Sequence, residues 1–166
     1  MQSNLNKYFV KSTRELFADE QLQSLKLIVF TLDRLNLAFP VEYVDKVIKQ
    51  KQIQGSGINQ FGIASLNEQQ VTVIDLYRRV FQSEQPSNDF TDVYLVIVKN
   101  SKDELYGVAV KKTPVLRDVP LSRIRVLPES YRRLDTLDIA SHVVVIPQET
   151  ETLTIFLLDV DLLLPV

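Results

Sequence analysis

The sequence predicts a mainly β protein made of two similar halves. Short apolar strands alternate with polar turns along most of the chain. Residues 61–81 follow the order strand, turn, strand, aspartate and apolar helical turn, and residues 143–164 repeat it. The hairpin pattern of residues 25–47 likewise returns in residues 94–119. Each half would hold about 70 residues, too few for a strong core of its own, so we expect two small β units that share one core.

Composition excludes several classes of function. The formal net charge of −2 gives no general attraction for phosphate backbones, so nucleic acid is not an expected partner. The chain has no cysteine, which removes disulfides, thiolate metal sites and a cysteine nucleophile. No apolar run is long enough to cross a bilayer, and the N-terminus lacks the pattern of a signal peptide. A soluble cytoplasmic protein is the expectation.

The N-terminal segment, residues 1–24, is polar and contains neither glycine nor proline. Its aromatic residues Tyr8, Phe9 and Phe17 are costly to leave in water. We therefore expect a short helix that packs on the body of the protein.

A hairpin and a short helix are predicted next. Strands at residues 25–32 and 37–39 flank a polar turn. Pro40 then suits the first turn of a helix over residues 41–47, in which three valines recur at three-residue spacing on one face.

The remaining elements follow from the same alternation of apolar runs and breakers. They are, in order, a loop at 55–57, a hairpin at 63–66 and 71–74, a helical turn after Asp75, a surface link at 82–91, a hairpin at 92–99 and 105–110, an edge strand or irregular connection at 114–128, and a last hairpin within 143–164. We expect lobe one at residues 25–90 and lobe two at 91–150. The C-terminal strand, within 151–166, would cross back to complete lobe one.

Residues that commonly carry catalysis are sparse. The only histidine, His142, stands beside an apolar run, which is more typical of a structural residue than of a base or ligand. Asp75 and Asp159 take matching places in the halves, and we expect each to cap the helical turn behind it; a paired-carboxylate site is the alternative. Charged residues expected in solvent are Asp161, Arg78, Arg79, Arg132 and Arg133. The sequence therefore predicts no enzyme, no metal site and no cofactor.

A duplicated β protein without a reaction centre usually works through its surfaces. Sheet edges and grooves accept strands or helices of other proteins. Two lobes side by side offer one groove between them and two outer surfaces. This geometry favours an adaptor between protein partners.

Three stretches carry a resemblance to a known family. GIASLNEQQVTVIDLYRRV is similar to the central motif of the CheW family, LIVFTLDRLNLAFPVEYVDKVI resembles its first hairpin and following helix, and LYGVAVKKTPVLRDV resembles its second-lobe hairpin. The resemblance implies two intertwined five-stranded β-barrels with short helices and no catalysis. It also implies a scaffold that couples chemoreceptor tips to the histidine kinase CheA, in the cytoplasm at membrane-associated receptor clusters.

The resemblance implies one surface for the kinase and one for the receptor. Kinase-facing residues would be Val44 and Lys46 on the short helix, Gly62 at the start of the central hairpin, and Asn67 in its turn. Receptor-facing residues would be Gly107, Thr113 and Leu116 in the second lobe. The alternative is that Val44 and Leu116 are core residues and that the glycines serve backbone geometry.

Several positions depart from the family pattern. Asn67-Glu68 stands where the family usually has Arg-Gly, Lys46 where an acid is usual, Lys111 where an aspartate is common, and Thr72 where a proline is usual. A reversed charge at a contact surface disfavours the usual partner and favours a complementary one. The hypothesis is a specialised paralogue with its own kinase and receptor, serving twitching, gliding or light-directed movement.

Three other possibilities stay open. One is a free-standing CheW-like regulator, or a relative of the kinase regulatory domain, that has lost receptor coupling. Another is a homo-oligomer in which one lobe pairs with the other lobe of a neighbour. An enzyme would require Asp75, Asp159 and His142 to meet in one pocket.

Overall fold

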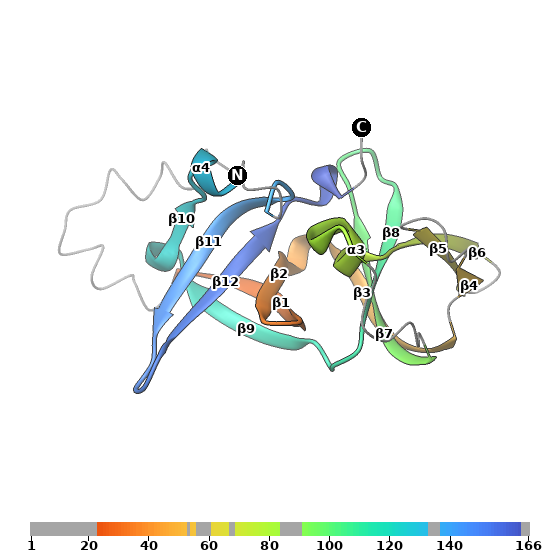
Figure 1. Cartoon of the computed structure of the whole chain (residues 1–166), viewed down its shortest axis with the longest axis horizontal. Helices are drawn as coiled ribbons and strands as arrows, with labels where there is room; N and C mark the ends of the chain where they lie inside the picture. Colours follow the sequence, from red (N-terminus) through yellow and green to blue (C-terminus); the bar gives the residue numbers. More distant parts are fainter. Residues whose placement is uncertain are drawn as a thin grey trace.

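The computed structural model describes residues 23–52, 54–55, 61–66, 69–83, 91–132 and 137–163. They form two curled sheets that lie side by side (Figure 1). The first sheet has the strand order β10-β11-β12-β2-β1-β9, with β1 Ser24–Leu32, β2 Leu35–Pro40, β9 Val115–Pro120, β10 Ile124–Val126, β11 Ala140–Pro147 and β12 Thr152–Leu158. The second has the order β3-β7-β8-β6-β5-β4, with β3 Val44–Gln52, β4 Gln54–Gly55, β5 Phe61–Leu66, β6 Gln69–Ile74, β7 Thr91–Lys99 and β8 Leu105–Val110.

Short helical turns connect the strands. They are η1 Val41–Tyr43, α3 Leu76–Phe81, η2 Leu121–Arg123, α4 Glu129–Arg132 and η3 Val160–Leu162. The predicted class, mainly β with short helices, is confirmed. Each sheet has six strands rather than five, because the very short β10 and β4 extend the outer edges.

The two halves of the sequence exchange hairpins. The β1–β2 hairpin lies in the sheet of β9 to β12, and the β7–β8 hairpin lies in the sheet of β3 to β6. Parallel pairing joins β12 to β2 and β6 to β8, while neighbouring strands elsewhere are antiparallel. The lobes are therefore intertwined, and the expected division into residues 25–90 and 91–150 follows the repeat but not the sheets.

The internal repeat extends to the turns that end each hairpin. Asp75 ends β6, and its carboxylate accepts a hydrogen bond from the Arg78 backbone N–H at 3.1 Å. Asp159 ends β12, and its Oδ1 accepts from the Asp161 backbone N–H at 2.9 Å. The capping role predicted for both aspartates is confirmed.

The helix predicted over residues 41–47 is wrong. Only Val41–Tyr43 is helical, and β3 begins at Val44 with extended backbone (φ −94°, ψ 117°). The three valines are β-branched, which favours strand. Pairing with β7 then extends the chain as far as Gln52. The edge strand expected within 114–128 is confirmed as β9, which lies at one edge of the first sheet.

The core is shared between the lobes. The largest buried cluster draws on both sheets, with Phe30 and Phe39 from the first and Val96 and Val108 from the second. Each sheet also encloses a smaller cluster, around Leu27 in the first and around Leu95, Ile97, Val71 and Val73 in the second. Burying one large apolar side chain contributes about 1.5–3 kcal/mol, so the shared cluster dominates the stability of the fold.

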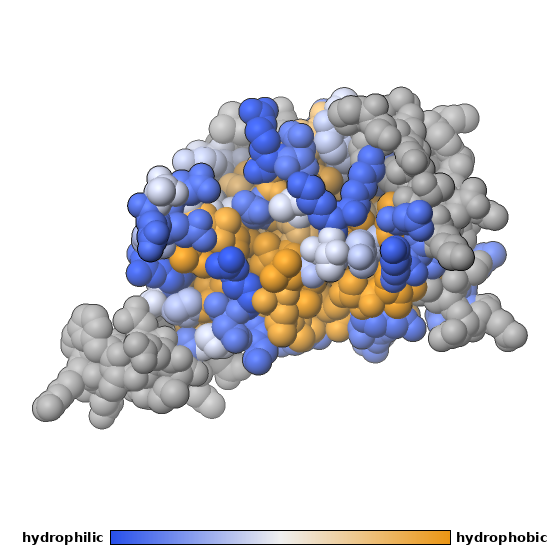
Figure 2. All heavy atoms as spheres, turned by 90° about the horizontal axis from the view of Figure 1, so that it is seen from below, coloured by the Kyte–Doolittle hydropathy of each residue, from blue (hydrophilic) through white to orange (hydrophobic). Residues whose placement is uncertain are grey.

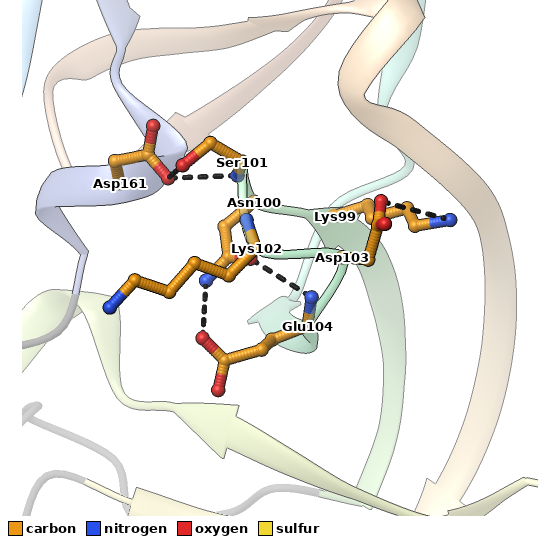
Figure 3. A network of polar contacts seen from close by, with 7 residues as sticks. All are labelled: Lys99, Asn100, Ser101, Lys102, Asp103, Glu104 and Asp161. Atoms are coloured by element: carbon orange, nitrogen blue, oxygen red, sulfur yellow. Dashed lines mark hydrogen bonds and ion pairs between the residues drawn. The ribbon is translucent and has the colours of Figure 1, made fainter.

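Polar contacts tie the sheets together beside α3 and η3. Oδ1 of Asp161, on η3, accepts hydrogen bonds from the backbone N–H and the hydroxyl of Ser101, both at 2.9 Å, in the β7–β8 turn (Figure 3). Two guanidinium nitrogens of Arg79, on α3, donate to the Asp138 carboxylate at 3.3 and 3.2 Å. Asp161 is exposed, as expected, and also contacts Ser101. The expectation that Arg79 lies in solvent is wrong, because its side chain is only 16% exposed and contacts Asp138.

Candidate partner-binding surfaces

The residues considered for catalysis serve the structure. Asp75 and Asp159 cap turns, as described above. His142 is half-buried on β11, and its Nδ1 lies 2.8 Å from the Ser141 hydroxyl. Burial lowers the pKa of His142, and the Asp159 carboxylate partly opposes this. Within the described ranges, no three His, Cys, Asp or Glu residues are placed to hold a metal ion.

The strand registers show which residues of the two sheets are equivalent. Two residues before each capping aspartate stand Val73 on β6 and Leu157 on β12. Val73 pairs with Gly107 on β8, and Leu157 pairs with Ala38 on β2. Gly107 and Ala38 therefore take the same place in the two lobes.

The same registers lead outward to the sheet edges. Gly107 and Ala38 pair with Ile97 on β7 and Val29 on β1, so the preceding residues Val96 and Ile28 are equivalent. Val96 pairs with Val47 on the edge strand β3, and Ile28 pairs with Leu116 on the edge strand β9. Val47 and Leu116 are thus the same position in the two lobes.

Both of these edge residues are exposed. The relative exposure is 38% for Val47 and 58% for Leu116. Ile28 and Tyr94, on the neighbouring strands, are half-buried and pack against the shared core. We call Ile28, Val47, Tyr94 and Leu116 the interlobe strip. Figure 2 shows extensive apolar surface on the face seen from below, the side on which β9 and β7 lie in Figure 1.

The predicted kinase-facing residues are only partly brought together. Val44 and Lys46 both lie on β3, where a register irregularity separates them. Val44 is half-buried against the shared core, whereas Lys46 is exposed. Gly62 lies on β5, near the opposite edge of the same sheet, and pairs with Gly55 and Val73. Asn67 lies outside the described residues.

Two of the three predicted receptor-facing residues lie on the surface. Thr113 is exposed in the segment that crosses from β8 to β9, and Leu116 follows on β9. The alternative that Leu116 is core is therefore wrong. Gly107 is buried, and a Cβ there would lie 2.9 Å from Cδ1 of Leu95. This position fits the alternative role in backbone packing, so we leave Gly107 out of the proposed surface.

Sequence reasoning missed Ile28, Val47 and Tyr94 as surface candidates. Ile28 and Tyr94 belong to apolar runs that predict strands, and Val47 belongs to the segment for which a helix was predicted. The strand registers point to Val47, because they make it the counterpart of Leu116. The signal was present only once the strand registers were known.

Together these features define a class of protein: a two-lobed β scaffold whose candidate binding surfaces are its sheet edges and the interlobe strip. A family model for the CheW-like domain matches residues 26–165, and the chain belongs to that family.

The fold also matches a solved structure. The scaffolding protein TtCheW from Thermoanaerobacter tengcongensis superimposes with a TM-score of 0.70 at 18% sequence identity, over 87% of this chain and 90% of that one. No curated protein matches the sequence. None of the described helices is long and apolar enough to cross a membrane.

Proposed function

We propose that this protein is a non-catalytic adaptor that couples a chemoreceptor to a CheA-type histidine kinase, as a specialised paralogue in a chemotaxis-like or motility pathway. The observation that carries the proposal is the interlobe strip in a CheW-like fold: two exposed apolar side chains at equivalent edge positions, beside two half-buried side chains that pack against the shared core. Such an adaptor works in the cytoplasm, at receptor clusters.

The interlobe strip suits the receptor. Exposed apolar side chains at a fixed spacing accept the apolar face of a helix, which is how many proteins bind helical segments. Leu116 lies on an edge strand of the first sheet and Val47 on an edge strand of the second, and we propose that one helical tip contacts both lobes there. Thr113 lies three residues before Leu116 in the exposed crossing segment. The surface for the receptor tip would therefore include Thr113 and Leu116.

The β3 edge suits the kinase. It is the outermost strand of the second sheet, so its outer backbone groups are available to another domain. Lys46 is exposed there and offers a positive charge, and Val44 lies two residues earlier. We propose that the kinase regulatory domain lies against this edge. Gly62, near the opposite edge of the sheet, and Asn67 remain predictions of the family resemblance.

The test is a titration of the full chain against two sets of partners from its own genome. One set is the CheW-like regulatory domains of its CheA-type kinases, and the other is the cytoplasmic tips of its receptors. We expect one kinase domain and one receptor tip to bind. Lys46→Glu should weaken kinase binding about three- to tenfold, because a reversed charge meets the complementary surface. Leu116→Ser should weaken receptor binding about tenfold or more and leave kinase binding unchanged.

Matched variants control for nonspecific effects. Lys102→Glu reverses an exposed charge in the β7–β8 turn, and Val126→Ser removes an apolar side chain, 73% exposed, at the other edge of the first sheet. Neither should change binding. If no kinase domain binds, the adaptor function is refuted. If a kinase binds but no receptor does, the free-standing regulator takes its place.

A further inference from the structure

The interlobe strip is nearly symmetric. Its exposed side chains, Val47 and Leu116, hold equivalent positions on β3 and β9, and each strand is the edge of its sheet beside the shared core. Apolar contact is not directional. A partner that used only these side chains would fit in two opposite orientations.

The charges beside the strip break this symmetry. On β3, Lys49 lies two residues after Val47 and pairs with Tyr94. On β9, Asp118 lies two residues after Leu116 and pairs with Lys26. The Lys26 ammonium lies 3.9 Å from the Asp118 carboxylate, so that side is compensated.

Lys49 has no such compensation. It is exposed, its cross-strand partner is the uncharged Tyr94, and none of the described acidic side chains forms an ion pair with it. Asp92 stands two residues before Tyr94 and is exposed, with a φ of 52° that departs from extended strand geometry, and it forms no ion pair with Lys49. The β3 side of the strip therefore carries a positive charge that its β9 counterpart lacks.

The crossing segment adds charge of the same sign. Residues 111–114 join β8 to β9 and cross between the lobes at the bottom of Figure 1, and Lys112 is exposed there. Like charges held together attract an acidic partner more strongly than a single charge does.

We propose that the interlobe strip takes an apolar helical segment flanked by acidic side chains, and that Lys49 sets its direction. The acidic flank lies against β3 and the uncharged flank against β9. The inference deepens the proposed function, because it states the chemistry that a receptor tip needs in order to bind this chain.

The test uses synthetic helical peptides with the full chain. Each peptide has one apolar stripe, glutamates along one flank, glutamines along the other, and a photo-crosslinker on the acidic flank. We expect crosslinks on β3 and β7 rather than on β9 and β1. A peptide with lysines in place of the glutamates should bind about three- to tenfold more weakly at low ionic strength, and added salt should reduce that difference.

A charge exchange is the decisive variant. Lys49→Glu with Asp118→Lys leaves the net charge unchanged and should move the crosslinks to β9. Lys102→Glu with Glu149→Lys makes the same exchange in two exposed turns and should leave the pattern as it is. Circular dichroism and thermal unfolding would check that each variant is folded.

Three outcomes would overturn the inference: equal crosslinking of both edges, an unchanged pattern in the exchanged variant, or no peptide binding. A different result is also informative. If no receptor tip binds but the peptides crosslink as expected, the proposed coupling to a receptor is refuted, while the proposed ligand preference of the interlobe strip stands.

Discussion

Gly107 and Ala38 occupy the same place in the two lobes, yet only one of them has a side chain. Both are buried within their sheets. A methyl group at Gly107 would lie 2.9 Å from Cδ1 of Leu95, which is fully buried and closely surrounded. Leu95 therefore occupies the space that a methyl group at Gly107 would need.

Gly107→Ala should lower the free energy of unfolding by about 1–3 kcal/mol, because the buried Leu95 side chain cannot move into solvent. Chemical denaturation measures the change. Leu95→Val makes room for the added methyl group. In the Gly107→Ala protein it should therefore lower the free energy of unfolding less than it does in the wild-type protein. Ala38→Gly is the matched control, with a smaller loss of about 0.5–1 kcal/mol from backbone entropy. A Gly107→Ala protein as stable as the wild type would contradict the packing argument.

The capped turns after β6 and β12 do more than end their hairpins. Each carries a side chain that contacts the other lobe: Arg79 from α3 contacts Asp138, and Asp161 from η3 contacts Ser101. The Arg79 side chain is only 16% exposed, whereas the Asp161 contact lies in solvent. The two turns thus form polar contacts between the intertwined lobes.

Asp161→Ala should lower the free energy of unfolding by about 0.5–1.5 kcal/mol, since two hydrogen bonds to one carboxylate are lost at an exposed site. Ser101→Ala should cost less, because the backbone N–H still donates to Asp161. A double-mutant cycle by urea denaturation measures the coupling, which we expect to make the double variant less than additive. Strict additivity would mean that the Ser101 hydroxyl contact contributes nothing to stability.

The exchange of hairpins makes each lobe depend on both halves of the chain. Neither sheet can be completed from residues 1–90 or from residues 91–166 alone. The shared cluster likewise takes residues from β1 and β2 as well as from β7 and β8. Folding of the whole chain should therefore be one cooperative transition.

Fragments 1–90 and 91–166 test this at the level of the whole molecule. Each alone should show no cooperative thermal transition, because its strands lack partners and its apolar faces lack cover. Mixed in equal amounts they should associate and recover a transition that circular dichroism detects. The prediction fails if either fragment unfolds cooperatively alone. Fragments divided at 1–104 and 105–166, which separate β7 from β8, should reassociate more weakly than this pair.

Local patterns predicted much of the fold. The hairpins at 25–39, 61–74 and 143–158 were visible as apolar runs around polar turns, and the capping aspartates were visible from their matching places. The prediction failed at 41–47, where three-residue spacing suggested a helix. Pairing with β7 makes residues from Val44 onward a strand, and such pairing is not visible in the local sequence.

The candidate surface was less predictable than the fold. In sequence, Leu116 and Val119 belong to the same apolar alternation, yet Leu116 is 58% exposed and Val119 is fully buried. Their difference depends on which face of β9 lies over the core of the first sheet. Lys49 likewise becomes distinctive only beside Tyr94, a residue 45 positions away in the chain.

The sequence by itself determined the class of fold, the duplication, the capped turns and the family, because these depend on the type and spacing of neighbouring residues. Only the tertiary structure decided that the hairpins are exchanged, that β3 and β9 are equivalent edges, and that Val47 and Leu116 hold equivalent exposed positions on them. The physical reason is that strand register and the closing of a core are set by contacts between residues far apart in the chain, and local periodicity carries no record of them.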